Sequence, residues 1–214
     1  MITVHSLAEK AGLYLAERAG KPEQVPILTY GLELVIGETI KLLVFIITAH
    51  FLDLLLPMLL LFCTSIPLRV LTGGQHCSSS LRCLVVSLIA YVCLAYLAGY
   101  LAALMNVTNL ILIAFLASIF LVVTLDKYGP GYSVNYSNSS SDPINTVTKF
   151  SFIFLAVWLI TIFAVNLIIN NQDIYSKIII STALGIYWQT LMITPLGHKL
   201  ISAVDKGLCQ LGIQ

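Results

Sequence analysis

The sequence LVVSLIAYVCLAYLAGYLAAL fills residues 84–104 and contains no charged side chain. Its length matches the roughly 20 residues that an α-helix needs to cross the ~30 Å hydrocarbon core of a bilayer. The rest of the chain has the same character, because 58% of its 214 residues are hydrophobic and only 10% are charged. Soluble domains average about 45–50% and about 25%. Because a globule of this size cannot hide so much apolar surface, the sequence predicts an all-α integral membrane protein.

Six apolar segments predict about six transmembrane helices. The first segment is interrupted by Glu33, Glu38 and Lys41, so a span that begins nearer Lys41 and includes Asp53 is the competing interpretation. An isolated charge at mid-bilayer costs roughly 2.5–3.5 kcal/mol, and Glu38 lies three residues before Lys41. We therefore expect these two side chains to pair on one helix face rather than to meet lipid alone. The six segments are residues 27–49, 51–68, 84–104, 110–125, 150–169 and 174–194.

Two polar regions accompany the spans in what we predict to be a single membrane-embedded domain, residues 1–214. Within the N-terminal segment 1–24, residues 6–18 predict an amphipathic helix of the kind that lies in a membrane interface. Residues 126–149 are rich in Gly, Pro, Asn and Ser and predict a polar loop. Apolar side chains recur at i, i+4 spacing along the N-terminal helix, at Leu7, Ala11, Leu15 and Ala19.

The positive charges predict the orientation in the membrane. With six spans and both termini in the cytoplasm, nine of the 11 Lys and Arg residues fall on the cytoplasmic side, which agrees with the positive-inside rule. Only Lys177 falls near the outer side, and Lys41 lies within a span. The nine are Lys10, Arg18, Lys21, Arg69, Arg82, Lys127, Lys149, Lys199 and Lys206.

Other features exclude some classes of protein. The net charge is +1 and there is no Lys/Arg-rich run, so nothing indicates a nucleic-acid partner. The five cysteines are scattered, which is not typical of a disulfide framework.

The segment RVLTGGQHCSSSLRC, Arg69–Cys83, lies between the second and third apolar segments. A thiol becomes a nucleophile when a base or a positive environment makes it a thiolate, and His76 and Cys83 are a candidate pair. On one continuous helix they would be ~10 Å apart along the axis, too far for the ~3 Å contact that proton transfer needs. A turn at Gly73 and Gly74 removes this difficulty by leaving His76 on a loop.

The serines at residues 78–80 are good N-cap residues, so the third span is expected to begin there. Cys83 then lies in or near the first turn, where the helix dipole favours an anion. From these residues alone three other interpretations stay open: packing or snorkelling side chains, a metal site of His76, Cys77 and Cys83, and a structural membrane subunit. A small transporter or channel subunit is a further alternative, because ionisable residues inside spans are functional candidates: Glu33, Glu38, Lys41, His50 and Asp53.

The pattern Arg-x3-Gly-Gly-x-His-x6-Cys between two spans resembles the signature of the accessory gene regulator B (AgrB-like) family. The N-terminal helix and the six apolar segments agree with that family. So do the loop sequence Tyr-Gly-Pro-Gly at residues 128–131 and the stretch from Leu184 to Gly197, which contains Gln189.

The resemblance implies a cysteine endopeptidase in the cell membrane of a Gram-positive-type bacterium, acting on a small amphipathic quorum-sensing propeptide. Cys83 would be the nucleophile and His76 the general base, and an internal thiol or hydroxyl of the substrate would release a cyclic thiolactone or lactone from the thioester. The resemblance also suggests a homodimer, and no metal or cofactor is expected. Cys77 departs from the small residue expected beside the histidine and is a rival nucleophile. Supporting or substrate-positioning residues are expected at Arg69, Gly73, Gly74, Gln75 and Gln189.

Overall fold

The structure is a computed structural model that describes residues 4–75, 77–129, 142–169 and 171–211. Every helix and turn below is taken from those residues. The chain forms two compact units, Met1–Leu52 and Asp53–Gln214, and we describe each unit by itself.

The first unit contains α1 (Val4–Ala19), a short 3-10 turn (Pro22–Gln24) and α2 (Val25–Phe51). Helix α1 is the predicted N-terminal amphipathic helix, and its buried face is made of small residues, with Ala8 and Ala16 fully buried. Gly12 allows α1 to approach α2 closely, since a Cβ there would lie 2.6 Å from Thr29 Oγ1.

The charged residues of α2 are arranged largely as predicted. Lys41 Nζ lies 2.6 Å from Glu38 Oε1, which confirms the expected pairing. Helix α2 ends at Phe51, and Asp53 follows it with a positive φ of 54°. A continuous span from Lys41 through Asp53 is therefore excluded.

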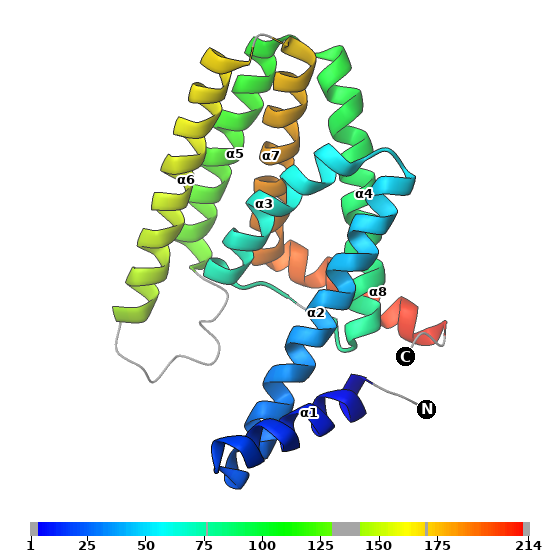
Figure 1. Cartoon of the computed structure of the whole chain (residues 1–214). Helices are drawn as coiled ribbons and strands as arrows, with labels where there is room; N and C mark the ends of the chain where they lie inside the picture. The colour runs from blue at the N-terminus through cyan, green and yellow to red at the C-terminus, as the bar shows by residue number, and fades with distance from the viewer. Residues whose placement is uncertain (1–3, 76, 130–141, 170, 212–214) are drawn as a thin grey trace. The chain divides into compact units, whose positions relative to one another are not determined.

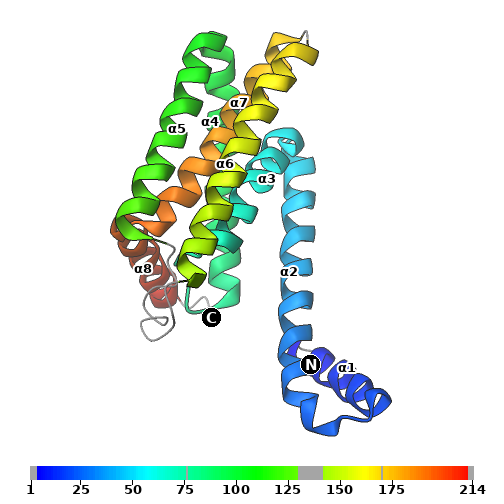
Figure 2. The ribbon, with the colours of Figure 1, turned by 90° about the vertical axis from the view of Figure 1, so that its left-hand side faces the viewer.

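The second unit is a helical bundle of α3 (Leu55–Thr72), α4 (Ser80–Leu104), α5 (Val107–Tyr128), α6 (Asp142–Ile168) and α7 (Gln172–Ile193), followed by α8 (Pro195–Gln210). Figures 1 and 2 show α4 to α7 running side by side, with α8 across the lower end of the bundle. Within the described residues, α3, α4, α5 and residues 147–168 of α6 are long and apolar enough to cross a membrane. The bent pair of α7 and α8 makes a fifth span if the pair is counted as one. The chain is thus an all-α, multi-pass membrane protein, and the count of six spans stays a prediction.

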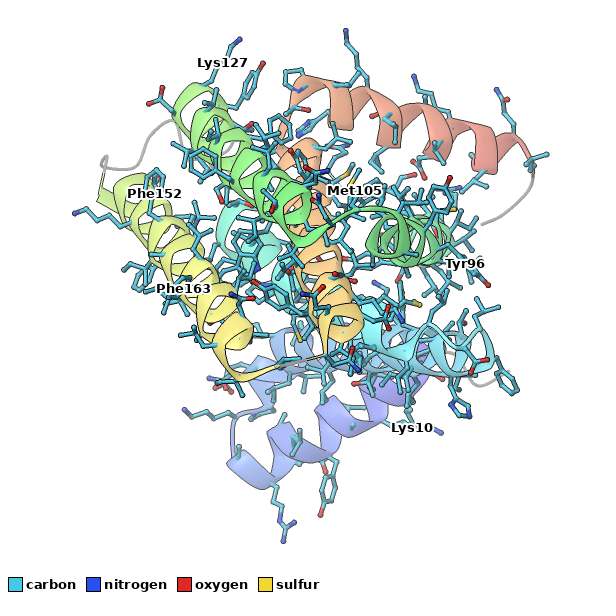
Figure 3. The ribbon with its side chains drawn as sticks, turned by 90° about the horizontal axis from the view of Figure 1, so that it is seen from above. Lys10, Tyr96, Met105, Lys127, Phe152 and Phe163 are labelled. Carbon is cyan, nitrogen blue, oxygen red and sulfur yellow. The ribbon has the colours of Figure 1, made fainter. Side chains whose placement is uncertain are left out.

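Helix α7 is the centre of the bundle, because residues on all of its sides are buried, including Ile179, Ala183 and Ile186 at 0% exposure. Gly185 lets α3 approach α7 closely, since a Cβ at this position would collide with Thr64 Oγ1. The outer helices instead present large apolar side chains to their surroundings. Tyr96 on α4 is 53% exposed and Phe163 on α6 is 67% exposed, and both lie on the outside of the bundle in Figure 3. This distribution fits a bundle whose surroundings are lipid.

The six predicted apolar segments correspond one by one to α2 through α7, with ends that shift by up to eight residues, the largest shift being the start of α6 at Asp142 instead of residue 150. The polar loop predicted over 126–149 is shorter than expected, because α5 continues to Tyr128 and α6 begins at Asp142; residues 130–141 lie outside the described part of the chain. Helix α8 was not predicted. It turns 84° from α7 and carries Lys199, Asp205 and Lys206.

Candidate functional site

The turn after α3 depends on two glycines. Helix α3 ends at Thr72, and the Gly73 amide donates to the Arg69 carbonyl oxygen at 2.8 Å. Gly73 has φ 72° and Gly74 has φ 139°. Residues other than glycine adopt such positive φ angles only with backbone strain. Gly74 also faces the end of α7, where an ideal Cβ would lie 3.5 Å from Met192 Cβ. The predicted turn at the glycine pair is confirmed, and it separates α3 from α4.

Two polar side chains hold the first part of this loop. Gln189 of α7 is only 1% exposed, and its Nε2 donates to the Gly73 carbonyl oxygen at 2.7 Å and to Thr72 Oγ1 at 3.0 Å. Arg69 Nη2 donates to the Gln75 carbonyl oxygen at 3.0 Å. Tertiary structure thus brings together the five predicted supporting positions, Arg69, Gly73, Gly74, Gln75 and Gln189.

Cys83 lies in the first turn of α4, as predicted. Ser79 is the N-cap position and Ser80 is the first helical residue. The Cys83 amide donates to the Ser79 carbonyl oxygen at 3.0 Å, so Cys83 belongs to the first hydrogen-bonded turn. A serine therefore occupies the N-cap position, as expected, but the side chain of Ser79 makes no capping hydrogen bond.

A polar cluster joins the end of the loop to α8. Asp205 Oδ2 accepts from the Ser78 hydroxyl at 2.7 Å and from the Ser78 amide at 3.2 Å. Asp205 Oδ1 accepts from Arg82 Nε at 2.9 Å, and Arg82 Nη2 donates to Ser78 Oγ at 2.6 Å. These three residues form a closed network, in which Arg82 is 8% exposed. The Ser78 hydroxyl, followed by the Ser78 amide and Arg82, holds the pKa of Asp205 below its usual value.

Sequence reasoning missed Asp205 as a site residue. It lies 127 positions after Ser78 and 123 after Arg82, and α8 itself was not predicted. The only signal in the sequence was that Asp205 is the single carboxylate in a C-terminal stretch that also holds Lys199 and Lys206. Such a pattern does not indicate a site residue.

The two cysteines of the loop region lie close together. Burial raises the pKa of Cys77 to about 11, with further increases from a negative charge on Cys83, from Asp205 and from a hydrogen bond to Cys83, against a decrease from Arg82. Cys77 is therefore a protonated thiol at neutral pH. His76 lies outside the described residues, and its contact with Cys83 stays a prediction.

A groove of about 400 Å³ borders the loop at Gln75. Its other wall is the face of α8 that carries His198, Lys199 and Lys206. The groove therefore opens beside the loop between α3 and α4.

Fold and site together define a multi-pass membrane protein with a thiol-containing loop pinned between the ends of its helices. The family model for accessory gene regulator B matches residues 8–193, and the chain belongs to that family. Its role is accordingly in the processing of quorum-sensing peptides.

Two AgrB-like proteins of Clostridium perfringens are similar to this chain. The one from strain SM101 is 27% identical over 188 residues, which are 86% of this chain and 87% of the relative. The second, from strain 13, is 24% identical over 187 residues, again 86% of this chain and 87% of the relative. No solved structure matches the chain significantly.

Proposed function

We propose that this protein is a membrane cysteine endopeptidase that cleaves a small quorum-sensing propeptide and assists its cyclisation. The observation that supports this function best is the placement of Cys83 in the first turn of α4, at the end of a loop pinned by α7 and α8. A helix N-terminus carries partial positive charge, which favours a thiolate over a thiol. Cys83 is therefore suited to act as the nucleophile.

Cys77 is poorly suited to act as the nucleophile. With a pKa of about 11, it is almost entirely protonated at neutral pH, whereas nucleophilic attack needs the thiolate. Its hydrogen bond with Cys83 is consistent with a Cys77 thiol that donates to a Cys83 thiolate. This arrangement supports the choice of Cys83.

The proposed reaction has two steps. In the first, the Cys83 thiolate attacks the scissile carbonyl carbon of the propeptide, and His76 gives its proton to the leaving amine, which leaves a thioester on Cys83. In the second, a thiol or hydroxyl within the substrate attacks that thioester, loses its proton to His76, and releases the Cys83 thiolate together with a cyclic thiolactone or lactone. Because water would compete as the attacking group in the second step, the site must exclude it.

The proposed site faces the cytoplasm, on the same side as both termini. The bias of positive charge toward this side supports that orientation, and α8 places Lys199 and Lys206 beside the loop. The alternative of a transporter or channel subunit loses support from α2, because Glu38 and Lys41 pair with each other.

The experiment is propeptide processing by the purified protein in lipid vesicles, with trapped intermediates analysed by mass spectrometry. Cys83→Ala is expected to abolish both cleavage and the acyl-enzyme, and Cys83→Ser to be nearly as damaging, since a hydroxyl stays protonated. His76→Ala is expected to slow cleavage by ~10²–10⁴-fold, the usual size of general acid–base assistance.

Cys77→Ala is the matched control, a second thiol from the same loop, and should retain most activity. Normal cleavage by Cys83→Ala would overturn the mechanism. Loss of cleavage in Cys77→Ala with full activity in Cys83→Ala would transfer the nucleophile to Cys77.

A further inference from the structure

We propose that Asp205 of α8 is a positioning residue for the Cys83 nucleophile, holding the end of the reactive loop and the beginning of α4 through Ser78 and Arg82. The proposal rests on the proposed function, since a positioning role requires that Cys83 carry the chemistry. Under this proposal, a residue of the C-terminal helix α8, outside the His–Cys motif, contributes to the reaction.

The carboxylate of Asp205 uses both of its oxygens on this part of the chain. Oδ2 accepts from the amide and the hydroxyl of Ser78, and Oδ1 accepts from Arg82 Nε. Hydrogen bonds that involve charged groups are the stronger ones. Arg82 is nearly buried, and removal of the partner of a buried charge is strongly unfavourable because the remaining charge is uncompensated. Asp205 is therefore an ionised acceptor that stabilises the nearly buried guanidinium of Arg82.

These contacts lie directly beside the nucleophile. Arg82 precedes Cys83, and the Cys83 amide is bonded to the carbonyl oxygen of Ser79, the neighbour of Ser78. Any movement of Ser78 and Arg82 therefore moves the turn that carries the Cys83 thiol. A displacement of about 1 Å at a reacting group can cost ~10²-fold in rate.

The orientation of α8 is itself set by a tight turn after α7. Thr194 Oγ1 accepts from the Gly197 amide at 3.2 Å, and a Cβ at Gly197 would collide with the Leu191 carbonyl oxygen. Helix α7 also carries Gln189, which holds Gly73 at the other end of the loop. Helix α7 thus contacts the beginning of the loop through Gln189, and α8 contacts its end through Asp205. Figure 1 shows α8 beside the start of α4.

The charge of Asp205 has a second effect, on the Cys77 thiol. The charged groups that face Cys77 are Cys83 and Arg82 from α4 and Asp205 from α8. Asp205 raises the pKa of Cys77, and the Ser78 hydroxyl and Arg82 keep Asp205 ionised by lowering its own pKa. Asp205 therefore opposes ionisation of Cys77.

The test compares Asp205→Asn with Asp173→Asn in the full chain, reconstituted in vesicles with the propeptide. Asp173 is a matched control, because it also forms an ion pair on a helix, with Lys177 at 2.7 Å, but lies at the opposite end of α7. We expect Asp205→Asn to lower kcat by about 10²-fold with little change in KM, and Asp173→Asn to leave both unchanged. Ser78→Ala, which removes the hydroxyl but keeps the amide contact, should give a smaller loss of kcat.

A second measurement tests whether the Asp205 carboxylate acts on the loop through its charge. In a Cys83→Ser background, iodoacetamide labelling of Cys77 is followed against pH. Asp205→Asn removes a nearby negative charge, so the pKa of Cys77 falls and its labelling profile shifts to lower pH, while Asp173→Asn leaves the profile in place.

Unchanged kcat in Asp205→Asn would overturn the proposal. So would a loss of kcat accompanied by an unshifted Cys77 profile, because the Asp205 carboxylate would then not lie beside the Cys77 thiol in the folded protein. If the proposed function itself is wrong, Cys83→Ala will process the propeptide normally. If Cys83→Ala is inactive but Asp205→Asn is fully active, only the role of Asp205 is rejected.

Discussion

The buried side-chain amide of Gln189 is the group whose removal most directly tests how α7 holds the loop between α3 and α4. Gln189→Met keeps the length of the side chain and removes two hydrogen bonds, to Gly73 O at 2.7 Å and to Thr72 Oγ1 at 3.0 Å. Thr72 keeps a partner, because its hydroxyl also donates to the Leu68 carbonyl oxygen at 2.7 Å. With a net contribution of roughly 1 kcal/mol for each hydrogen bond, the loop loses about 2 kcal/mol of local stability. That loss corresponds to a roughly 30-fold change in the equilibrium between the loop bound to α7 and the loop detached from it.

Amide hydrogen exchange measured by mass spectrometry on the protein in lipid nanodiscs reports this equilibrium directly. We expect protection at Gly73 to fall by roughly 30-fold, whereas the Ser78 amide, which Asp205 holds at 3.2 Å, should change much less. Ser181→Ala is the matched control on α7, because the Ser181 hydroxyl is buried and without a hydrogen-bond partner among the described residues. Exchange at Gly73 within twofold of the unaltered protein in Gln189→Met would refute the reasoning.

Four further predictions concern packing, the turn, the second thiol and the orientation. Gly185→Ala should destabilise the bundle by roughly 1–3 kcal/mol through overpacking, seen as a lower Tm in detergent, and Thr64→Ala should recover part of that loss because the new Cβ collides with Thr64 Oγ1. Gly74→Ala should cost about 1–3 kcal/mol because Gly74 has a positive φ of 139°. We expect propeptide processing to fall while Tm changes little, and processing equal to that of the unaltered protein would contradict this. Iodoacetamide labelling of Cys77 in the unaltered protein should stay low through neutral pH and rise only as the pH approaches its pKa of about 11, since only the thiolate reacts. Reporter fusions at Asn138 should report a cytoplasmic position, and an external one would reject the proposed topology.

Prediction of the helices from the sequence succeeded because a bilayer imposes a simple length requirement. Segments such as 84–104 must satisfy their backbone hydrogen bonds internally, so their apolar length alone indicates α4. Prediction was less accurate where polar residues adjoin a helix. Asp142 begins α6 although its surroundings read as loop, because Asp, Asn and Ser are found both in loops and in the first turn of a helix.

Prediction of the local backbone around the candidate site was partly successful for a related reason. The glycine pair and the serines before α4 are local signals, and they predicted the turn at Gly73 and the place of Cys83. The spacing of His76 and Cys83 indicated only that a loop must separate them.

The sequence by itself determined the apolar lengths of the spans, the turn between α3 and α4, and the position of Cys83 in a first helical turn, because each of these depends on residues near one another in the chain. Only the tertiary structure decided which distant side chains hold that turn. Gln189 lies 116 positions from Gly73 and Asp205 lies 123 from Arg82. Their hydrogen bonds exist because Gly185 lets α7 pack closely on α3, and because the chain bends by 84° between α7 and α8. Close packing and a bend are properties of the folded bundle, and no local pattern in the sequence specifies which partners they bring together.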